Sequence, residues 1–172
     1  MLFEKHKDYI DDLFTRYPIK RSALLPLLNL AQKEEGYVSQ GAMREIASIL
    51  DLTPPQVFET ATFYTMLHLK PIGEYHIQVC RSLMCALVKA DNLIEWLQKH
   101  LDISVGQTTL DKMFTLSAVE CLGSCGTGPM MQINDDYYER LTEDKVEKIL
   151  ADLKQTGHCE LKSGPFMAPE PR

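Results

Sequence analysis

The order of apolar and polar residues divides the chain into a helical first part and a mixed second part. Up to about residue 70, apolar side chains recur every three or four positions, which is the repeat of a helix with one buried face. From Gly73 onward, short segments that alternate with a period of two appear between further helical segments. We therefore predict an N-terminal helical region over 1–72, an α/β or α+β domain over 73–155, and an extended tail over 156–172.

Apolar stripes and boundary residues predict the first two helices. The first helix ends before Tyr17 and carries its apolar stripe at five positions, Leu2, Phe3, Ile10, Leu13 and Phe14. The second is predicted to begin at Ser22, a residue type that caps helix N-termini, and to end at Gly36. Pro26 is compatible with this helix because a proline in the first turn removes no helical hydrogen bond.

Two more helices are predicted before the change of pattern. Ser39 is the expected N-cap of the third helix, and Thr53 with Gln56 has the spacing of a capping box at the start of the fourth. The fourth helix is predicted to continue towards Pro71, and it carries three aromatic residues, Phe58, Phe63 and Tyr64. Such a group is more typical of a core, and packing against a partner protein is the alternative.

The second part is predicted to fold as strand, helix, strand, strand and helix. Tyr75, Ile77 and Val79 alternate with polar residues and lead directly to Cys80. From Cys85 to residue 101 the apolar positions fit one face of a single helix. Segments 114–119 and 130–133 are the next strands, an Asp135-Asp136 hairpin turn follows, and Thr142 caps the last helix. This order favours a small α/β or α+β sandwich with helices on the sheet.

Composition and charge narrow the functional class. The chain has 172 residues, 45% of them hydrophobic and 24% charged, which are ordinary proportions for a globular protein. A net charge of -6 disfavours nucleic acid as a partner. The N-terminus lacks the pattern of a leader, and no apolar run approaches the roughly 20 residues that span a bilayer. We predict a cytoplasmic protein that meets a membrane only through a larger complex.

Four cysteines form two closely spaced pairs. The spacing is C-x4-C, then thirty-five intervening residues, then C-x3-C, and the residues are Cys80, Cys85, Cys121 and Cys125. Cytosolic thiols are kept reduced, so these pairs indicate metal binding or redox chemistry in place of disulfides. Cys159, the fifth cysteine, is alone in the predicted tail and is expected to be a bystander.

The spacing favours a 2Fe-2S cluster and leaves two alternatives open. Each iron of such a cluster takes two protein thiolates, which two short-range pairs supply. Structural zinc usually uses C-x2-C pairs, and it remains open together with unligated thiols. Amides of three glycines are the expected hydrogen-bond donors to sulfur, Gly123, Gly126 and Gly128. The start of a helix at Cys85 is expected to favour its thiolate.

Other metal and redox arrangements fit the sequence less well. A thioredoxin-type dithiol requires C-x-x-C, and the plant-type ferredoxin requires C-x4-C-x2-C; neither pattern is present. His68 and His76 are possible ligands of a Rieske-like site, but four cysteines already complete a ligand set, so we interpret both histidines as structural or surface residues. No nucleophile and base pair is evident, and no catalytic residue is predicted.

At these cysteines the sequence resembles a known family, the NuoE family, which is the thioredoxin-like 2Fe-2S component of NADH-quinone oxidoreductase (respiratory complex I), with relatives in NAD-linked hydrogenases and formate dehydrogenases. The matching segments occur in the family's order, at 61–65, 79–85, 106–109, 121–125, 128–134 and 141–142. Two positions depart from the family pattern, because Lys89 stands where the family often has Gly and Gly128 where it often has Ala.

The resemblance implies a helical N-terminal bundle, a thioredoxin-like domain, and one 2Fe-2S cluster on Cys80, Cys85, Cys121 and Cys125. It also implies a permanent neighbour, a NuoF-like flavin subunit that binds FMN and NADH, in the peripheral arm of a membrane-bound complex. The cluster is expected to exchange single electrons with that flavin, while the hydride chemistry belongs to the neighbour. The host is either the quinone reductase or one of the related hydrogenases or formate dehydrogenases.

Overall fold

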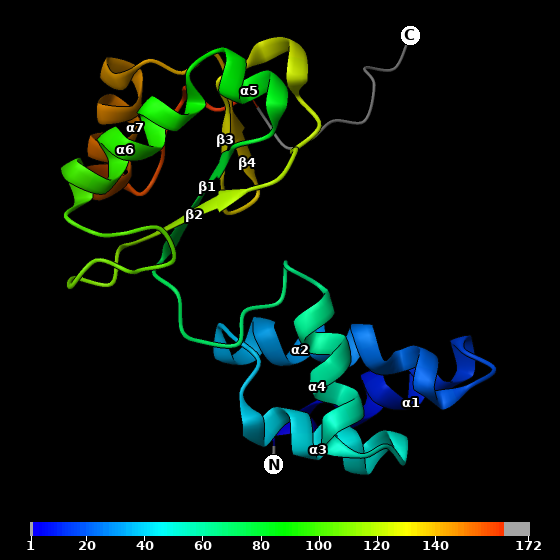
Figure 1. The fold of residues 1–172 in the computed structure, drawn as a ribbon. Coiled ribbons are helices and arrows are strands. Elements are labelled where there is room, and N and C mark those ends of the chain that lie inside the picture. The colour runs from blue at the N-terminus through cyan, green and yellow to red at the C-terminus, as the bar shows by residue number, and fades with distance from the viewer. Residues whose placement is uncertain (1, 164–172) are drawn as a thin grey trace, which may run out of the picture. The chain divides into compact units, whose positions relative to one another are not determined.

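The computed structural model describes residues 2–163, and the chain separates into two compact units, Met1–Pro71 and Ile72–Arg172. The first unit is helical and the second combines a sheet with helices, as predicted (Figure 1). Each unit has a hydrophobic core of its own. The change of sequence period at Gly73 therefore coincides with the change from one unit to the other.

Residues 2–71 of the first unit form two 3-10 helices and four α-helices. Their bounds are η1 Leu2–His6, α1 Lys7–Arg16, η2 Lys20–Ala23, α2 Leu24–Glu35, α3 Gln40–Leu50 and α4 Pro54–Phe63. Apolar side chains from all of them meet in one core, in which Leu27, Leu28 and Ile46 are completely buried. Packing of these amphipathic faces stabilises helices that are too short to be stable alone.

In the first unit, local signals predicted two helix starts correctly and one incorrectly. The Oγ of Ser39 accepts the backbone N–H of Ala42 at 3.0 Å, and the Oε1 of Gln56 accepts that of Thr53 at 2.9 Å. Ser22, in contrast, lies inside η2, and the N-cap of α2 is Ala23, which has no side-chain hydrogen bond. The prediction of Ser22 as N-cap was wrong because the preceding turn of 3-10 helix already supplies the entry into α2.

The fourth helix ends earlier than the sequence indicates. Tyr64 has an extended backbone, so α4 stops at Phe63 and does not continue towards Pro71. Phe58 and Phe63 are 51% and 77% exposed, while Tyr64 is half-buried and packs edge-on against the ring of Phe63. The interpretation of this aromatic group as core was therefore wrong for both phenylalanines.

The second unit is built on a four-stranded sheet. Its elements are β1 Tyr75–Cys80, α5 Leu83–Leu87, α6 Ala90–Leu101, β2 Phe114–Val119, η3 Cys125–Thr127, β3 Met131–Ile133, β4 Asp136–Tyr138 and α7 Glu143–Thr156. The strand order is β2-β1-β3-β4; β1 and β2 are parallel, and the other pairs are antiparallel. Helices α6 and α7 cover the same face of the sheet (Figure 1), and their apolar residues share its core.

The predicted strands are confirmed, and one strand was missed. In the β3–β4 hairpin Ile133 pairs with Asp136, so the two-residue turn is Asn134 and Asp135 and not Asp135 and Asp136. Asn134 has a positive φ of 52°, a conformation that asparagine adopts more readily than most residues. Only three residues form β4, too few for an alternating pattern to be visible in the sequence.

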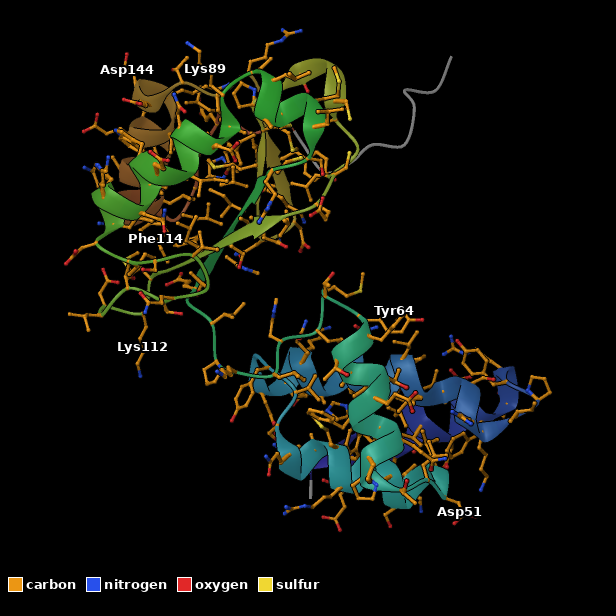
Figure 2. All side chains as sticks on the ribbon, viewed as in Figure 1. Asp51, Tyr64, Lys89, Lys112, Phe114 and Asp144 are labelled. Atoms are coloured by element: carbon orange, nitrogen blue, oxygen red, sulfur yellow. The ribbon has the colours of Figure 1, made fainter. Side chains whose placement is uncertain are left out.

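The single helix predicted from Cys85 to residue 101 is in fact two helices. Lys89, labelled in Figure 2, lies between α5 and α6. Its φ is positive, 69°, a backbone conformation that glycine adopts without cost. The main core of this unit takes side chains from α6 and none from α5, whose Cys85 is buried in a separate small cluster with Ala90.

The start of the predicted tail packs onto the second unit. Helix α7 ends at Gly157, which has a positive φ of 70°. Cys159 is 2% exposed and belongs to the core beneath the sheet, where its thiol lies 3.6 Å from a carboxylate oxygen of Asp152. Cys159 is thus a core residue and not an element of a free tail. Residues 164–172 lie outside the described part of the chain.

Candidate metal centre

The parallel pair of strands brings the two cysteine pairs to one edge of the sheet. Cys80 is the last residue of β1 and pairs in register with Val119, two residues before Cys121. The carboxyl ends of parallel strands meet at the same edge of a sheet. The pairing of β1 with β2 therefore brings the two cysteine pairs together, although they are far apart in the sequence. Cys85 then follows on α5, and Cys125 begins η3.

The four sulfurs differ in their exposure. Cys80 and Cys85 are buried in a small cluster with Ala90 and Met130, whereas Cys121 and Cys125 are exposed. The Sγ atoms of Cys121 and Cys125 are 3.4 Å apart. The thiol of Cys80 is close enough to those of Cys85 and Cys121 to affect their pKa values. The site therefore has a buried side and a side open to solvent.

The electrostatics of the thiols follow from this difference. Burial, with the neighbouring Cys80, raises the pKa of Cys85 to about 11. The start of α5 at Leu83 therefore does not bring the pKa of Cys85 below its usual value. The backbone N–H of Gly123 donates to the Sγ of Cys121 at 3.3 Å and lowers the pKa of that thiol, while the nearby Cys121 raises the pKa of Cys125.

Of the three glycines that were predicted to donate their amides to sulfur, only Gly123 is found to do so in the described residues, while Gly128 contributes in a different way. Gly123 has a positive φ of 87° and supplies the amide donor to Cys121. Gly128 provides space, because a Cβ atom there would lie 3.3 Å from the Sγ of Cys85. A Cβ atom added at Gly126 would have no neighbour within 4 Å. No hydrogen bond from the amide of Gly126 to sulfur is found in the described residues.

The loop from Cys121 to Thr127 is attached to the end of β4 by a carboxylate that sequence reasoning missed. Ser124 Oγ donates a short hydrogen bond to Oε1 of Glu139, and Thr127 Oγ1 donates to the same oxygen at 2.5 Å. These hydroxyls lower the pKa of Glu139. The backbone of Thr127 also accepts the N–H of Arg140 at 2.7 Å. Glu139 reaches this loop only because of the β3–β4 hairpin, so no sequence motif predicts the contact.

His68, one of the two histidines that we considered as ligands, belongs to the first unit, and the other, His76, bonds within the sheet of the second. Nε2 of His76 is 2.8 Å from Oγ of Ser117, a contact between β1 and β2, and His76 is buried. Its interpretation as a structural residue is confirmed. Within residues 2–163, no group of three or more His, Cys, Asp and Glu side chains is arranged to hold a single metal ion.

Comparison with known proteins assigns the family. The model of the thioredoxin-like 2Fe-2S ferredoxin family matches residues 10–154. The chain belongs to this family. The E subunit of NADH-quinone oxidoreductase from Rickettsia felis is 45% identical over 150 residues, which are 86% of this chain and 90% of that protein. An E subunit of the same oxidoreductase from Rhizobium meliloti is 40% identical over 148 residues, 86% of this chain and 88% of the relative.

A solved structure shows the same fold. A chain of an NAD+-reducing NiFe-hydrogenase superposes with a TM-score of 0.68 and is 22% identical; the match covers 77% of this chain and 23% of the hydrogenase chain. At this identity the likeness concerns the fold alone. Within the described residues no helix has both the length and the apolar character to cross a membrane.

Membership of the thioredoxin-like 2Fe-2S ferredoxin family confirms a 2Fe-2S cluster as the cofactor. The site fits that cofactor on its own chemistry. Four thiols lie at one sheet edge, an amide of Gly123 is directed at sulfur, and Gly128 leaves space beside the buried thiol of Cys85. A cluster with two irons does not need three ligands around one ion, since each iron takes two thiolates.

Proposed function

We propose that this chain is the electron-transfer subunit of an NADH-quinone oxidoreductase and that Cys80, Cys85, Cys121 and Cys125 hold its 2Fe-2S cluster. The observation that carries the proposal is the parallel register of β1 and β2, which places both cysteine pairs at one edge of a domain of this family. The bound cluster would supply one-electron transfer to and from the FMN of a partner subunit that oxidises NADH.

The protein's own contribution is to shape and compensate the site. The buried side, with Cys80, Cys85 and Met130, excludes water from two of the sulfurs. On the exposed side, the amide of Gly123 donates to Cys121, and such donors favour a charged sulfur. The chain holds no catalytic residue in this proposal, and its role is to fix one redox centre close to the surface.

The partner is proposed to contact the exposed surface next to the cysteines. Four large apolar side chains there are 44% to 72% exposed, Leu83, Met84, Leu87 and Val88. Apolar side chains gathered at a surface are typical of contacts with other proteins. We assign this α5 surface to the flavin subunit and place the assembly in the peripheral arm of a membrane-bound complex. The sequence identities favour the quinone reductase over the hydrogenase as host.

The cofactor is tested by spectroscopy on the purified chain. We expect a brown protein that contains iron and acid-labile sulfide and gives a 2Fe-2S EPR signal after reduction. Ala substitutions at each of the four proposed ligands are expected to abolish or alter that signal. The matched control is Cys159→Ala, which removes a buried cysteine outside the site and leaves the signal unchanged. A colourless protein that contains zinc contradicts the proposal.

The partner is tested by co-purification of the chain with the flavoprotein encoded in the same cells. We expect Leu87→Glu to weaken the association, because it places a charge on the α5 surface. Val105→Glu is the matched control, since Val105 is also exposed but lies in the loop that follows α6. A native chain that migrates alone and binds NADH by itself contradicts the division of roles between the two proteins.

A further inference from the structure

We propose that Glu139 is a positioning residue of the 2Fe-2S site, which anchors the loop from Cys121 to Thr127 and lowers the reduction potential of the cluster with its negative charge. This inference rests on the proposed function. It concerns a side chain that neither belongs to a ligand pair nor touches a cysteine, and its evidence is the arrangement of hydrogen bonds between the end of β4 and the loop.

The contacts between the carboxylate and the loop are specific. Oε1 of Glu139 accepts from Ser124 and from Thr127, and the two hydroxyl oxygens are 2.7 Å apart. An ionised carboxylate only accepts hydrogen bonds, and each hydroxyl has one proton. The hydroxyl of Thr127 also lies 3.0 Å from the backbone carbonyl oxygen of Ser124, so its one proton is shared between that carbonyl and the carboxylate. The carboxylate nevertheless contacts both Ser124 and Thr127 and links these two loop residues to the end of β4.

The anchor acts on the residues between the proposed ligands. Ser124 is directly before Cys125, and Gly123, whose amide donates to Cys121, is directly before Ser124. The position of Ser124 therefore sets the position of both the donor amide and a ligand. Thr127 holds the other end of the turn, since its carbonyl accepts the N–H of Arg140 at 2.7 Å.

The backbone segment that carries Glu139, residues 139–141, is itself held in place by hydrogen bonds. The Nζ of Lys145, on the first turn of α7, donates to the backbone carbonyl of Glu139 at 2.6 Å. The N–H of Leu141 donates to the carbonyl of Pro129 at 3.0 Å. These bonds join residues 139–141 to α7 and to the segment that follows the loop, so the carboxylate is presented from a fixed support.

The charge of Glu139 adds an electrostatic effect to this mechanical one. A cluster with four thiolates becomes more negative when it is reduced, and a nearby negative charge disfavours the added electron. Arg140 and Lys145 are the cations on the same segment, but substitution of Glu139 leaves both unchanged. Removal of the carboxylate charge is therefore expected to raise the reduction potential.

Two substitutions separate the two effects. In Glu139→Gln the amide oxygen takes the place of the oxygen that accepts both hydroxyls, so the anchor remains while the charge is lost. In Glu139→Ala both are lost. The matched control is Glu147→Gln, which removes the same charge from an exposed position on α7. Circular dichroism and thermal unfolding establish that each variant folds.

The effect of the Glu139 charge is measured as a change in the midpoint reduction potential of the purified protein, in a redox titration monitored by EPR. We expect Glu139→Gln to shift the potential to a more positive value and by more than Glu147→Gln, with an unchanged EPR line shape. Equal potentials in the two variants would overturn the electrostatic part of the proposal. The measurement does not depend on activity of the assembled complex.

The effect of Glu139 on the position of the loop is measured by hydrogen exchange of the backbone amides of residues 121–127. We expect Glu139→Ala to accelerate exchange about tenfold or more, since two hydrogen bonds to a charged group are lost, and Glu139→Gln to have a smaller effect. Unchanged exchange in Glu139→Ala would overturn the positioning role. This readout also applies to the chain without its cluster, so it distinguishes failure of the anchor from failure of the proposed cofactor site.

Discussion

Gly128 and Cys85 are so close that a Cβ atom on Gly128 would lie 3.3 Å from the Sγ of Cys85, and the same atom would lie 3.0 Å from Cγ2 of Val88. The first contact is with a buried thiol and the second with a side chain that is 44% exposed. An alanine here is therefore accommodated only if Val88 moves. This relationship favours glycine at position 128.

Gly128→Ala is expected to lower the free energy of unfolding by about 1 kcal/mol and to alter the EPR line shape of the cluster, because Val88 and Cys85 are crowded. In the double variant Gly128→Ala, Val88→Ala we expect most of both effects to disappear. Val88→Ala alone is the control and is expected to change stability little, since the side chain is largely exposed. A wild-type spectrum and stability in Gly128→Ala would contradict the crowding.

Lys89→Gly is expected to raise the free energy of unfolding by roughly 0.5 kcal/mol. The left-handed backbone of Lys89 costs a residue with a side chain about 1–2 kcal/mol, and the greater freedom of glycine in the unfolded chain offsets part of this gain. Urea unfolding measures the change. Glu95→Gly, at an exposed position in the interior of α6, is the control and is expected to destabilise by about 1 kcal/mol. Loss of stability in both variants would show that Lys89 is not strained.

Gly73→Ala is expected to destabilise the second unit by about 1–3 kcal/mol. A Cβ atom at Gly73 would lie 2.8 Å from the backbone oxygen of Met113, and the N–H of Gly73 donates to Thr115 at 2.6 Å, so neither backbone segment is able to move away easily. Gly41→Ala, on the first turn of α3, would meet Ser39 at 3.5 Å and is expected to stabilise its helix by about 0.5–1 kcal/mol. Thermal unfolding of both variants checks the contrast.

The carboxylate of Glu139 predicts a pH dependence of stability. Its pKa in the folded chain is lowered from 4.5, first by Ser124 and then by Thr127, so the folded state binds the proton less well than the unfolded state does. The stabilisation is complete above pH 4.5 and is lost as the pH falls through the lower folded pKa. We expect the stability difference between wild type and Glu139→Gln to shrink below about pH 4.5 in urea titrations. A constant difference from about pH 7 to about pH 3 would contradict this assignment.

Much of the local structure was predictable because its causes lie within a few residues. The caps at Ser39, Thr53 and Thr142 and the strand that ends at Cys80 are examples. The two cysteine pairs were identified from spacing, since a metal site that uses short-range pairs leaves that spacing in the chain. The prediction that both pairs reach one edge required only that the two strands run side by side in parallel.

Other features depend on contacts between residues far apart in the chain. The raised pKa of Cys85 follows from burial, and the core position of Cys159 follows from packing against the sheet. The interruption of the helix at Lys89 was missed because a stripe of apolar residues indicates which side chains are buried and carries no information on the backbone angles between them.

The sequence by itself determined the helical first unit, the strands and the four cysteines, because side-chain periodicity, capping and ligand spacing are local properties. Only the tertiary structure decided which sulfurs are buried, how closely Gly128 approaches Cys85, and that Glu139 lies beneath the loop of Cys121 and Cys125. These are distances across the fold, and they exist only after the β3–β4 hairpin and the parallel ladder have brought separate segments together.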